Sequence, residues 1–308
     1  MAIQEVDKIW HNGKLVPWKE ATTHVMTHAL LYGTCAFEGI RAYKTDHKGT
    51  CIFRNKAHID RLFYSAKVYY IDIPFTQQEI LDAAAETVRV NGLESAYIRI
   101  NANLGYGEVG PYSLDCPTDV SIVCFPWGRY LGDEAMAKGI KVGVSSWRRS
   151  APGTIPAGVK AAGNYLSSRL ITIEAKKRGY TEGIGLAHDG TVSEGAGENL
   201  FVVKGGRIIT PPFAASILGG ITRDSAITLA RKLGYEVVEQ NIPREMLYAA
   251  DEIFLTGTAA EVTKVASVDD HQVGDGNYPI SDKIQKTFFG LFTGETEDEW
   301  GWLEPIEK

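Results

Sequence analysis

Lys160 lies among small and apolar residues, in the segment TIPAGVKAAGNY at residues 154–165. An amine held in such surroundings is costly to keep protonated, and the neutral amine is a nucleophile. Schiff-base chemistry with an aldehyde requires this property. A solvated loop lysine is the ordinary alternative, and this segment taken alone favours that alternative.

Two carboxylates, Glu194 and Glu198, lie among glycines in the segment SEGAGENLF at residues 193–201. Glycines let a backbone approach a ligand closely, so a carboxylate here could meet a flat ring. A polar turn before an apolar strand is the simpler interpretation of this motif by itself.

Two further segments are suited to bind an anion. Gly219-Gly220 precedes a helix that Thr222 is predicted to open, and the N-terminus of a helix attracts negative charge. The turn at residues 256–261 offers backbone N–H groups and two hydroxyls after an apolar strand. Each segment also has an ordinary role, as a helix cap or a turn. Together, a lysine, a carboxylate and two anion-binding segments are what pyridoxal 5'-phosphate (PLP) requires for its aldehyde, ring nitrogen and phosphate.

Six motifs, in this order along the chain, resemble the bacterial branched-chain amino acid aminotransferases, which are fold-type IV PLP enzymes of the class IV aminotransferase family. They are EGIRAY at 38–43, FPWGRYLG at 125–132, the lysine segment at 154–166, SEGAGENLF at 193–201, GITRD at 220–224 and GTAAE at 257–261. The resemblance extends from Trp10 to the segment GLFTGETEDEWGW at residues 290–302. Any one motif would be weak, whereas six in order are specific.

The resemblance implies a role for each residue that matches a family motif. Lys160 matches the lysine that forms the Schiff base and carries the proton, and Glu194 matches the acid beside the pyridine nitrogen. The other cofactor-binding residues implied are Arg61, Tyr165, Gly220, Ile221, Thr222 and Thr258. The substrate-binding residues implied are Tyr32, Phe37, Tyr97, Arg99, Trp127, Tyr130, Thr258 and Ala259.

The resemblance also implies an α+β fold with two domains and the active site between them, as in D-amino acid aminotransferase. The implied activity is reversible, PLP-dependent transfer of the amino group between leucine, isoleucine or valine and 2-oxoglutarate. Tyr32 would come from a neighbouring subunit, so a homodimer at least, or a hexamer, is expected. The loop at residues 100–118 departs from the bacterial pattern, and in the family this loop borders the substrate pocket.

Two alternatives stay open on the sequence. The first is another reaction on the same fold, by a D-amino acid or (R)-selective amine transaminase or an aminodeoxychorismate lyase; Arg99 and the FPWG segment weigh against it. The second is a non-catalytic protein that uses the segment at residues 219–222 to bind a phosphorylated metabolite.

The elements that must position these residues can be predicted from periodicity and caps. Thr76-Gln77-Gln78-Glu79 is a capping box that opens a helix ending near Gly92. Further helices are predicted from Asn55, at 164–179, from Thr222 to Gly234 and after Pro243. Strands are predicted at 8–11, 14–17, 51–54, 96–101, 120–125, 140–147, 183–187, 200–204, 207–210, 235–240, 252–256 and 262–268. Most strands are joined as hairpins, which favours α+β: a small domain at 1–126, a connector at 127–139 and a cofactor-binding domain at 140–308.

Composition excludes several classes of protein. The chain has 308 residues, is 44% hydrophobic and carries a net charge of −6, which is typical of a soluble globular protein without nucleic-acid partners. Cys35, Cys51, Cys116 and Cys124 have no metal-ligand spacing, so we expect reduced thiols and no metal site. The sequence predicts no signal peptide or membrane span, so a cytoplasmic location is expected.

Overall fold

The computed structural model describes residues 3–128 and 133–306, which form two compact units. Unit 1 comprises the chain up to Trp127, together with Val159–Gly163 and the residues from Phe292 onward. Unit 2 comprises Gly128–Gly158 and Asn164–Leu291. The predicted first boundary differs from this division by one residue. Val159–Gly163 and the residues from Phe292 onward were expected in the C-terminal domain. They belong to unit 1 instead, because both segments bind its strands through backbone hydrogen bonds.

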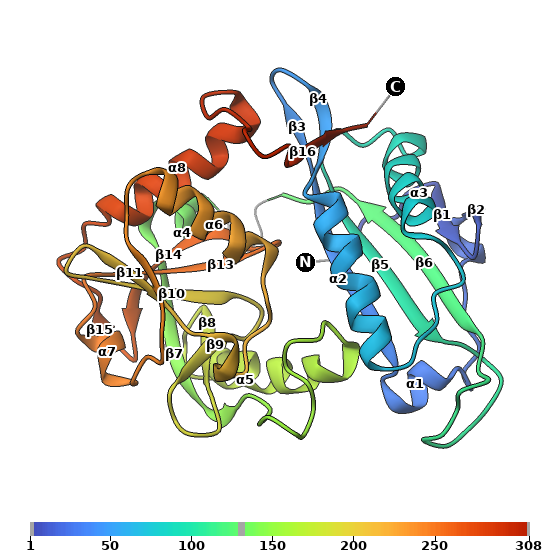
Figure 1. The fold of residues 1–308 in the computed structure, drawn as a ribbon, viewed down its shortest axis with the longest axis horizontal. Helices are drawn as coiled ribbons and strands as arrows, with labels where there is room; N and C mark the ends of the chain where they lie inside the picture. Colours follow the sequence, from blue (N-terminus) through green and yellow to red (C-terminus); the bar gives the residue numbers. More distant parts are fainter. Residues whose placement is uncertain (1–2, 129–132, 307–308) are drawn as a thin grey trace. The chain divides into compact units, whose positions relative to one another are not determined.

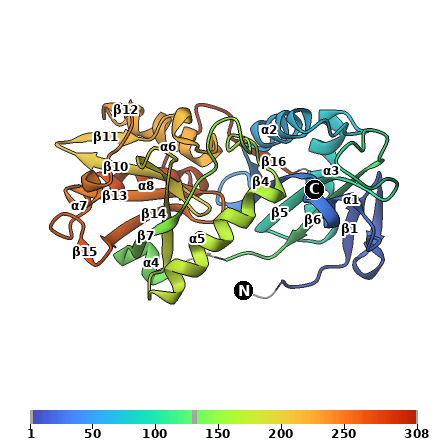
Figure 2. The same cartoon turned by 90° about the horizontal axis from the view of Figure 1, so that it is seen from below.

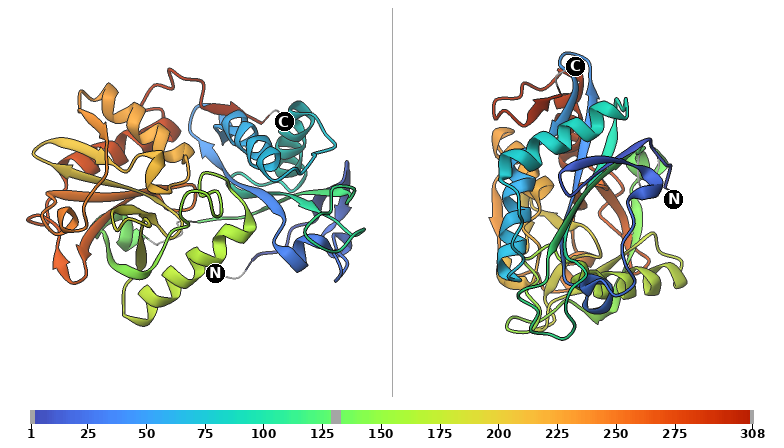
Figure 3. Two further views of the ribbon diagram at one scale, coloured as in Figure 1. Left: turned by 60° about the horizontal axis from the view of Figure 1, so that its bottom comes forward. Right: turned by 90° about the vertical axis from the view of Figure 1, so that its right-hand side faces the viewer.

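Unit 1 is built on a seven-stranded sheet with the strand order β16-β4-β3-β5-β6-β1-β2, in which the pairs are antiparallel. Its strands are β1 (Lys8–His11), β2 (Lys14–Pro17), β3 (Cys35–Thr45), β4 (Gly49–Phe53), β5 (Ala96–Leu104), β6 (Thr118–Phe125) and β16 (Leu303–Pro305). Its helices are α1 (His28–Tyr32), α2 (Asn55–Val68), α3 (Gln77–Val90) and the 3₁₀ turn η1 (Trp18–Glu20). Helices α2 and α3 lie side by side on one face of this sheet (Figure 3).

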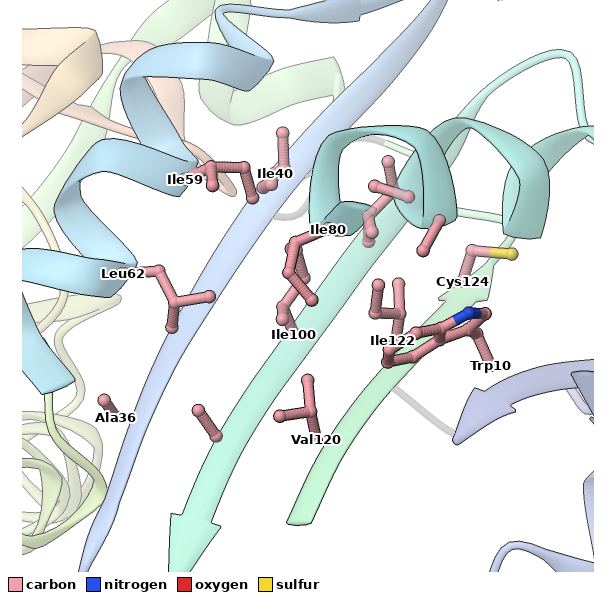
Figure 4. Packing of buried hydrophobic residues seen from close by; sticks show 14 of the residues in the cluster. Trp10, Ala36, Ile40, Ile59, Leu62, Ile80, Ile100, Val120, Ile122 and Cys124 are labelled. Carbon is pink, nitrogen blue, oxygen red and sulfur yellow. The ribbon is translucent and has the colours of Figure 1, made fainter. Parts of the chain in front are cut away.

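The core of unit 1 lies between that face of the sheet and the two helices (Figure 4). Along β5 every second residue is buried, so Ile98, Ile100 and Ala102 face the helices. The residues between them face the other side of the sheet. Helix α2 contributes Ile59 and Leu62, both fully buried, at helical spacing. The second face of β3 and β5 is therefore available to polar and aromatic side chains.

Unit 2 is built on a nine-stranded sheet with the order β12-β11-β10-β13-β14-β7-β8-β9, and β15 pairs with β14 (Figure 1). Its strands are β7 (Ile140–Arg148), β8 (Glu182–Leu186), β9 (Val192–Gly195), β10 (Asn199–Lys204), β11 (Arg207–Thr210), β12 (Val237–Glu239), β13 (Glu252–Gly257), β14 (Glu261–Val268) and β15 (His271–Gln272). The remaining helices are α4 (Asp133–Lys138), η2 (Ala162–Asn164), α5 (Tyr165–Lys177), η3 (Phe213–Ala215), α6 (Ile221–Lys232), α7 (Glu245–Tyr248) and α8 (Pro279–Thr293). Helix α5 packs along β7 and β8 (Figure 2). Pairs β7–β8, β7–β14 and β11–β12 are parallel, and the other pairs in the unit are antiparallel.

Three sequence predictions about helix starts compare with the structure as follows. The capping box is confirmed, because Thr76 and Glu79 exchange both hydrogen bonds at the start of α3. Asn55 does not cap α2; it is the first helical residue, and the cap position belongs to Arg54 in the left-handed conformation at φ 54°. Thr222 does not open α6 either, since the helix begins at Ile221 after Gly220, whose position needs no side-chain cap.

Two structural findings concern the thiols and the membrane question. The four cysteines are free thiols, and Cys51, Cys116 and Cys124 are buried. Burial raises the pKa of Cys35 and of Cys124 to about 11, so both stay protonated near neutral pH. No helix of the described residues is long and apolar enough to cross a membrane.

Candidate active site

Lys160 is held by its backbone against strand β3 and helix α2. The Phe37 N–H donates to the Lys160 carbonyl over 3.0 Å, and the Lys160 N–H donates to Ser65 Oγ over 3.1 Å. Next to it, Ala36 and Ala161 form an isolated antiparallel bridge. The Lys160 Nζ lies 4.7 Å from the centre of the Phe37 ring. The amine is thus placed over an aromatic face by a backbone that is fixed on both sides.

A buried carboxylate lies on the helix-facing side of the same strand. Glu38 is fully buried and accepts from Arg61 Nε over 2.7 Å, from Arg61 Nη2 over 2.9 Å and from His58 Nδ1 over 2.7 Å. Burial raises the pKa of Glu38, but Arg61 and His58 outweigh burial and hold that pKa well below its ordinary value. Burial lowers the pKa of His58, against the effect of Glu38. Arg61 is therefore clamped in one orientation by a charged carboxylate.

Replacing Glu38 with glutamine is expected to lower the free energy of unfolding by about 3 kcal/mol, because it leaves the mostly buried Arg61 without its counter-charge. The pKa of Glu38 is lowered by folding, so its contribution is present above the unfolded pKa of about 4.3 and is lost as the pH falls below that value. Urea unfolding at several pH values measures this. The matched control is Asp60→Asn on the exposed side of α2, where the pair with Lys56 should contribute about 0–1 kcal/mol. Equal stability of both variants would contradict the prediction.

The face of the sheet that points away from the helices carries three of the residues predicted to bind substrate, Phe37, Tyr97 and Arg99. The Arg99 guanidinium lies 4.4 Å from the Phe37 ring centre and 5.7 Å from that of Tyr97. Tyr97 in turn lies 5.0 Å from Trp127 and 5.5 Å from Phe125, between ring centres. The structure thus brings Phe37, Tyr97, Arg99 and Trp127 into one cluster of three aromatic rings and a cation. An apolar side chain and a carboxylate would both find partners there.

Tyr32 lies at the last residue of α1 and is 49% exposed. Its hydroxyl accepts from the Gly110 N–H over 3.1 Å, while His28 Nε2 donates to the Gly110 carbonyl over 2.9 Å. The loop at residues 100–118 is therefore attached to α1 by these two hydrogen bonds and by a third, in which the His28 N–H donates to the Gly105 carbonyl over 2.9 Å. This connection could not be predicted from the sequence, because 78 residues separate Tyr32 from Gly110.

Glu194 is buried in unit 2, on strand β9, with both carboxylate oxygens bonded. Oε1 lies 2.6 Å from Arg149 Nη2, and Oε2 accepts from Asn199 Nδ2 and from the Leu218 N–H, each over 3.0 Å. Arg149 is a functional candidate that the sequence did not reveal, because nothing in its surroundings distinguishes it from Arg148. The Arg149 guanidinium would keep the Glu194 carboxylate ionised, and an ionised carboxylate is what a protonated ring nitrogen needs beside it.

Glu198, the second carboxylate of the motif, is buried but differently paired. Its Oε2 accepts from the Gly197 N–H over 3.1 Å. Burial, together with the nearby Glu182, raises the pKa of Glu198 to about 8. Glu198 is therefore mostly protonated at neutral pH, and Glu194 is the one of the two that an arginine pairs.

The two segments predicted to bind an anion both lie in unit 2. Gly220 precedes α6 in an extended conformation without a side-chain cap, and a Cβ at this position would overlap Asn199 Oδ1. Thr222 is buried in the first turn of α6. Thr258 and Ala259 lie in the turn between β13 and β14, where Gly257 pairs with Glu261. The structure confirms the predicted turn between these strands.

Each unit by itself carries residues whose chemistry suits a part of PLP. Unit 1 has the Lys160 amine, which suits the aldehyde, and the cation of Arg61. Unit 2 has the Glu194 carboxylate and the two predicted anion-binding segments. Thr256 Oγ1, just before the second of these segments, is buried and has no hydrogen-bond partner among the described residues. A buried hydroxyl without a partner is costly, so a ligand that accepts or donates there would be favoured. Tyr165 is the first residue of α5, and Tyr130 lies outside the described residues.

Comparison with known proteins places this chain in a family. Residues 35–268 match the family model described as amino-transferase class IV. The chain belongs to the class IV aminotransferases. The branched-chain-amino-acid aminotransferases of Salmonella typhimurium and Escherichia coli K12 are each 53% identical to it over 312 residues, covering 100% of both chains. The predicted family is thereby confirmed.

Solved structures agree with this assignment. The crystal structure of the Escherichia coli branched-chain amino acid aminotransferase has a TM-score of 0.95 at 53% identity and covers 98% of this chain and 100% of its own. The branched-chain amino acid aminotransferase from Thermobaculum terrenum, solved in its PLP form, has a TM-score of 0.91 at 34% identity, covering 98% and 99%. The predicted fold class, the assignment as an enzyme and the predicted cofactor are confirmed for this class IV aminotransferase.

Proposed function

We propose that this class IV aminotransferase transfers the amino group between leucine, isoleucine or valine and 2-oxoglutarate, with PLP as its cofactor. The observation that carries the proposal is the Lys160 amine, which a backbone hydrogen-bonded on both sides places 4.7 Å from the centre of the Phe37 ring, a ring that the Arg99 guanidinium also contacts. The relatives named above act on branched-chain amino acids, which supports the choice of substrate.

The cofactor-binding roles are assigned by residue chemistry. Bound PLP supplies an aldehyde that links to amines and a ring that accepts an electron pair from the substrate. Lys160 would hold the aldehyde, and Glu194, supported by Arg149, would keep the ring nitrogen protonated. Arg61, Gly220, Ile221, Thr222 and Thr258 would bind the phosphate, and Tyr165 would lie beside the phenolic oxygen.

The proton transfer is assigned to Lys160. Its Nζ, released when a substrate amine takes its place, would remove the proton from the substrate Cα and later return it. The Phe37 ring under Nζ and the backbone contacts of Lys160 limit the amine to a small region, as an efficient proton carrier requires.

Substrate recognition is assigned to the aromatic cluster and its cation. Phe37, Tyr97, Trp127 and Tyr130 would surround the branched side chain, because apolar walls favour it by burial. Arg99 would bind the side-chain carboxylate of glutamate or 2-oxoglutarate in a two-point contact. Thr258 and Ala259 would bind the α-carboxylate through their backbone N–H groups. One pocket could then accept both substrate classes in turn.

Replacing Arg99 with alanine is expected to weaken the glutamate half-reaction strongly and the valine half-reaction little. A lost charge-assisted pair costs roughly 2–5 kcal/mol, which is a factor of about 30 to several thousand in kcat/KM. Stopped-flow measurement of each half-reaction at the cofactor absorption band tests this. In a purely structural role Arg99 would brace its strand against an acid such as Glu94, but Glu94 binds Lys44 Nζ over 2.9 Å. Equal losses for both half-reactions, with a lower Tm, would reject the assignment.

An amino-donor panel against 2-oxoglutarate tests the proposed function directly. Leucine, isoleucine and valine are expected to react, with the purified protein showing the yellow absorption of a bound Schiff base. Turnover of D-amino acids or (R)-amines instead would favour the other transaminases of this fold. A colourless protein that binds phosphorylated metabolites and transfers no amino group would favour the non-catalytic alternative.

We further propose a cytoplasmic enzyme that is a homodimer at least. Tyr32, the residue expected to reach a neighbouring subunit, is half exposed. Exposed apolar side chains adjoin it in the sequence: Val25, Met26, Leu30 and Leu31. Such a group of exposed apolar side chains is typical of a subunit contact, and sedimentation analysis would test it.

A further inference from the structure

Gly39 occupies the middle of strand β3, opposite Arg99 of β5. A glycine in a strand interior weakens the strand, because it adds chain entropy to the unfolded state and contributes no side chain. Gly39 is not among the residues with positive φ, so its backbone conformation is open to alanine. Backbone conformation therefore does not explain why position 39 has no side chain.

The space above Gly39 is occupied by the side chain of Tyr97. A Cβ on Gly39 would overlap the Tyr97 hydroxyl, and it would lie 2.7 Å from Tyr97 Cζ and 3.2 Å from Tyr97 Cε2. Tyr97 of β5 lies opposite Arg41 of β3, so its side chain extends diagonally across β3 to reach Gly39. The three atoms nearest to such a Cβ all belong to Tyr97. Gly39 therefore acts as a recess for this one ring.

We propose that Gly39 is a positioning residue that sets the substrate preference of the pocket by leaving room for the end of the Tyr97 side chain against β3. The inference rests on the proposed function, in which Tyr97 is one wall of the substrate pocket. With alanine at position 39, the strand would stay, because it is paired with β5 from Cys35 to Ala42, and the end of the Tyr97 side chain would move. Because the Tyr97 ring contacts Arg99 and Trp127, this movement would change the shape of the cluster.

The displaced ring would narrow the pocket, so wide substrates should suffer more than narrow ones. Valine and isoleucine branch at Cβ, whereas alanine carries one methyl group. A misplacement of about 1 Å at a reacting site can cost a hundredfold in rate. We expect Gly39→Ala to lower kcat/KM by about tenfold or more when valine is the amino donor. When alanine is the amino donor, the factor of loss should be at least about fivefold smaller. The absorption of the bound cofactor should not change.

Four proteins test the proposal: wild type, Gly39→Ala, Tyr97→Leu and the double variant. A leucine side chain at position 97 lacks the tyrosine atoms that a Cβ at position 39 would meet. In the Tyr97→Leu background, Gly39→Ala should therefore change kcat/KM for the substrate valine by no more than about twofold. Binding of the unreactive 3-methylbutanoate, followed by the fluorescence of Trp127 beside Tyr97, should weaken in Gly39→Ala and not further in the double variant. This binding measurement does not depend on turnover.

The outcomes separate this inference from the proposed function. Gly39 does not act through Tyr97 if Gly39→Ala lowers kcat/KM by the same factor in the wild-type and Tyr97→Leu proteins. The same conclusion follows if Gly39→Ala leaves the preference for the substrate valine over the substrate alanine unchanged. If Gly39→Ala is insoluble, a soluble double variant supports the proposal, and two insoluble variants contradict it. A wild-type protein that does not transaminate branched-chain amino acids overturns the proposed function itself.

Discussion

Replacing Lys160 with alanine is expected to lower transamination by at least about four orders of magnitude, because one amine both holds the cofactor and moves the proton. The fold should remain, since the segment is attached through the Lys160 carbonyl and N–H and not through the side chain. Turnover with leucine and 2-oxoglutarate measures the loss. Borohydride reduction, which fixes a Schiff base, should no longer attach the cofactor to the protein.

Lys177→Ala is the matched control for this prediction, because Lys177 lies exposed in the last turn of α5. It should retain full activity and normal cofactor attachment. A Lys160→Ala protein that keeps wild-type rates would remove the central residue from the proposed mechanism.

Replacing Glu194 with glutamine is expected to reduce kcat by about two to three orders of magnitude, with a smaller change in substrate affinity. A neutral amide cannot stabilise a proton on the ring nitrogen, and that proton matters most as negative charge develops on the substrate. The substitution also leaves the mostly buried Arg149 without its counter-charge, so a loss of about 3 kcal/mol in the free energy of unfolding should accompany it. Single-turnover kinetics with [2-²H]-leucine, beside urea unfolding, separates the two effects.

Glu198→Gln offers a control at almost the same place in the sequence. Glu198 has a pKa of about 8, so it already carries a proton at neutral pH and its amide variant should retain most of the activity. Unchanged proton abstraction in Glu194→Gln, or equal losses in both variants, would show that Glu194 is not the acid beside the ring nitrogen.

The local elements of the fold could be predicted well where short-range chemistry decides them. The predicted strands at 8–11 and 14–17 pair as a hairpin, with Asn12 and Gly13 at positive φ in its turn, and the α3 capping box is confirmed as well. Strand β3 could not be predicted, because Glu38, Gly39 and Arg41 interrupt the apolar pattern of CAFEGIRAYKT. Those three residues are buried for reasons that come from elsewhere in the chain, such as Arg61 and Tyr97.

In the candidate site, too, residues within a local motif could be predicted, whereas residues that depend on distant contacts could not. Lys160 and Glu194 could be selected from sequence because glycine-rich motifs surround them. Arg149 and His58 could not, since each acts through a contact with a residue 20 or more positions away. The pairing of Glu38 with Arg61 illustrates the difficulty: the partners lie 23 residues apart, on a strand and a helix that must already be packed.

The edge strand β16 has a consequence for how the protein is made. It pairs with β4, and the Arg54 N–H donates to the Trp302 carbonyl over 2.7 Å, so residues separated by 248 positions lie side by side. A ribosome releases the N-terminal strands first, yet the sheet of unit 1 acquires this edge only after residues 303–305 have left the exit tunnel. Until then β4, which contains the apolar Ile52 and Phe53, is an unpaired edge that is open to pairing with other chains. Nascent chains halted before residue 300 should therefore depend on chaperones more than the released protein does.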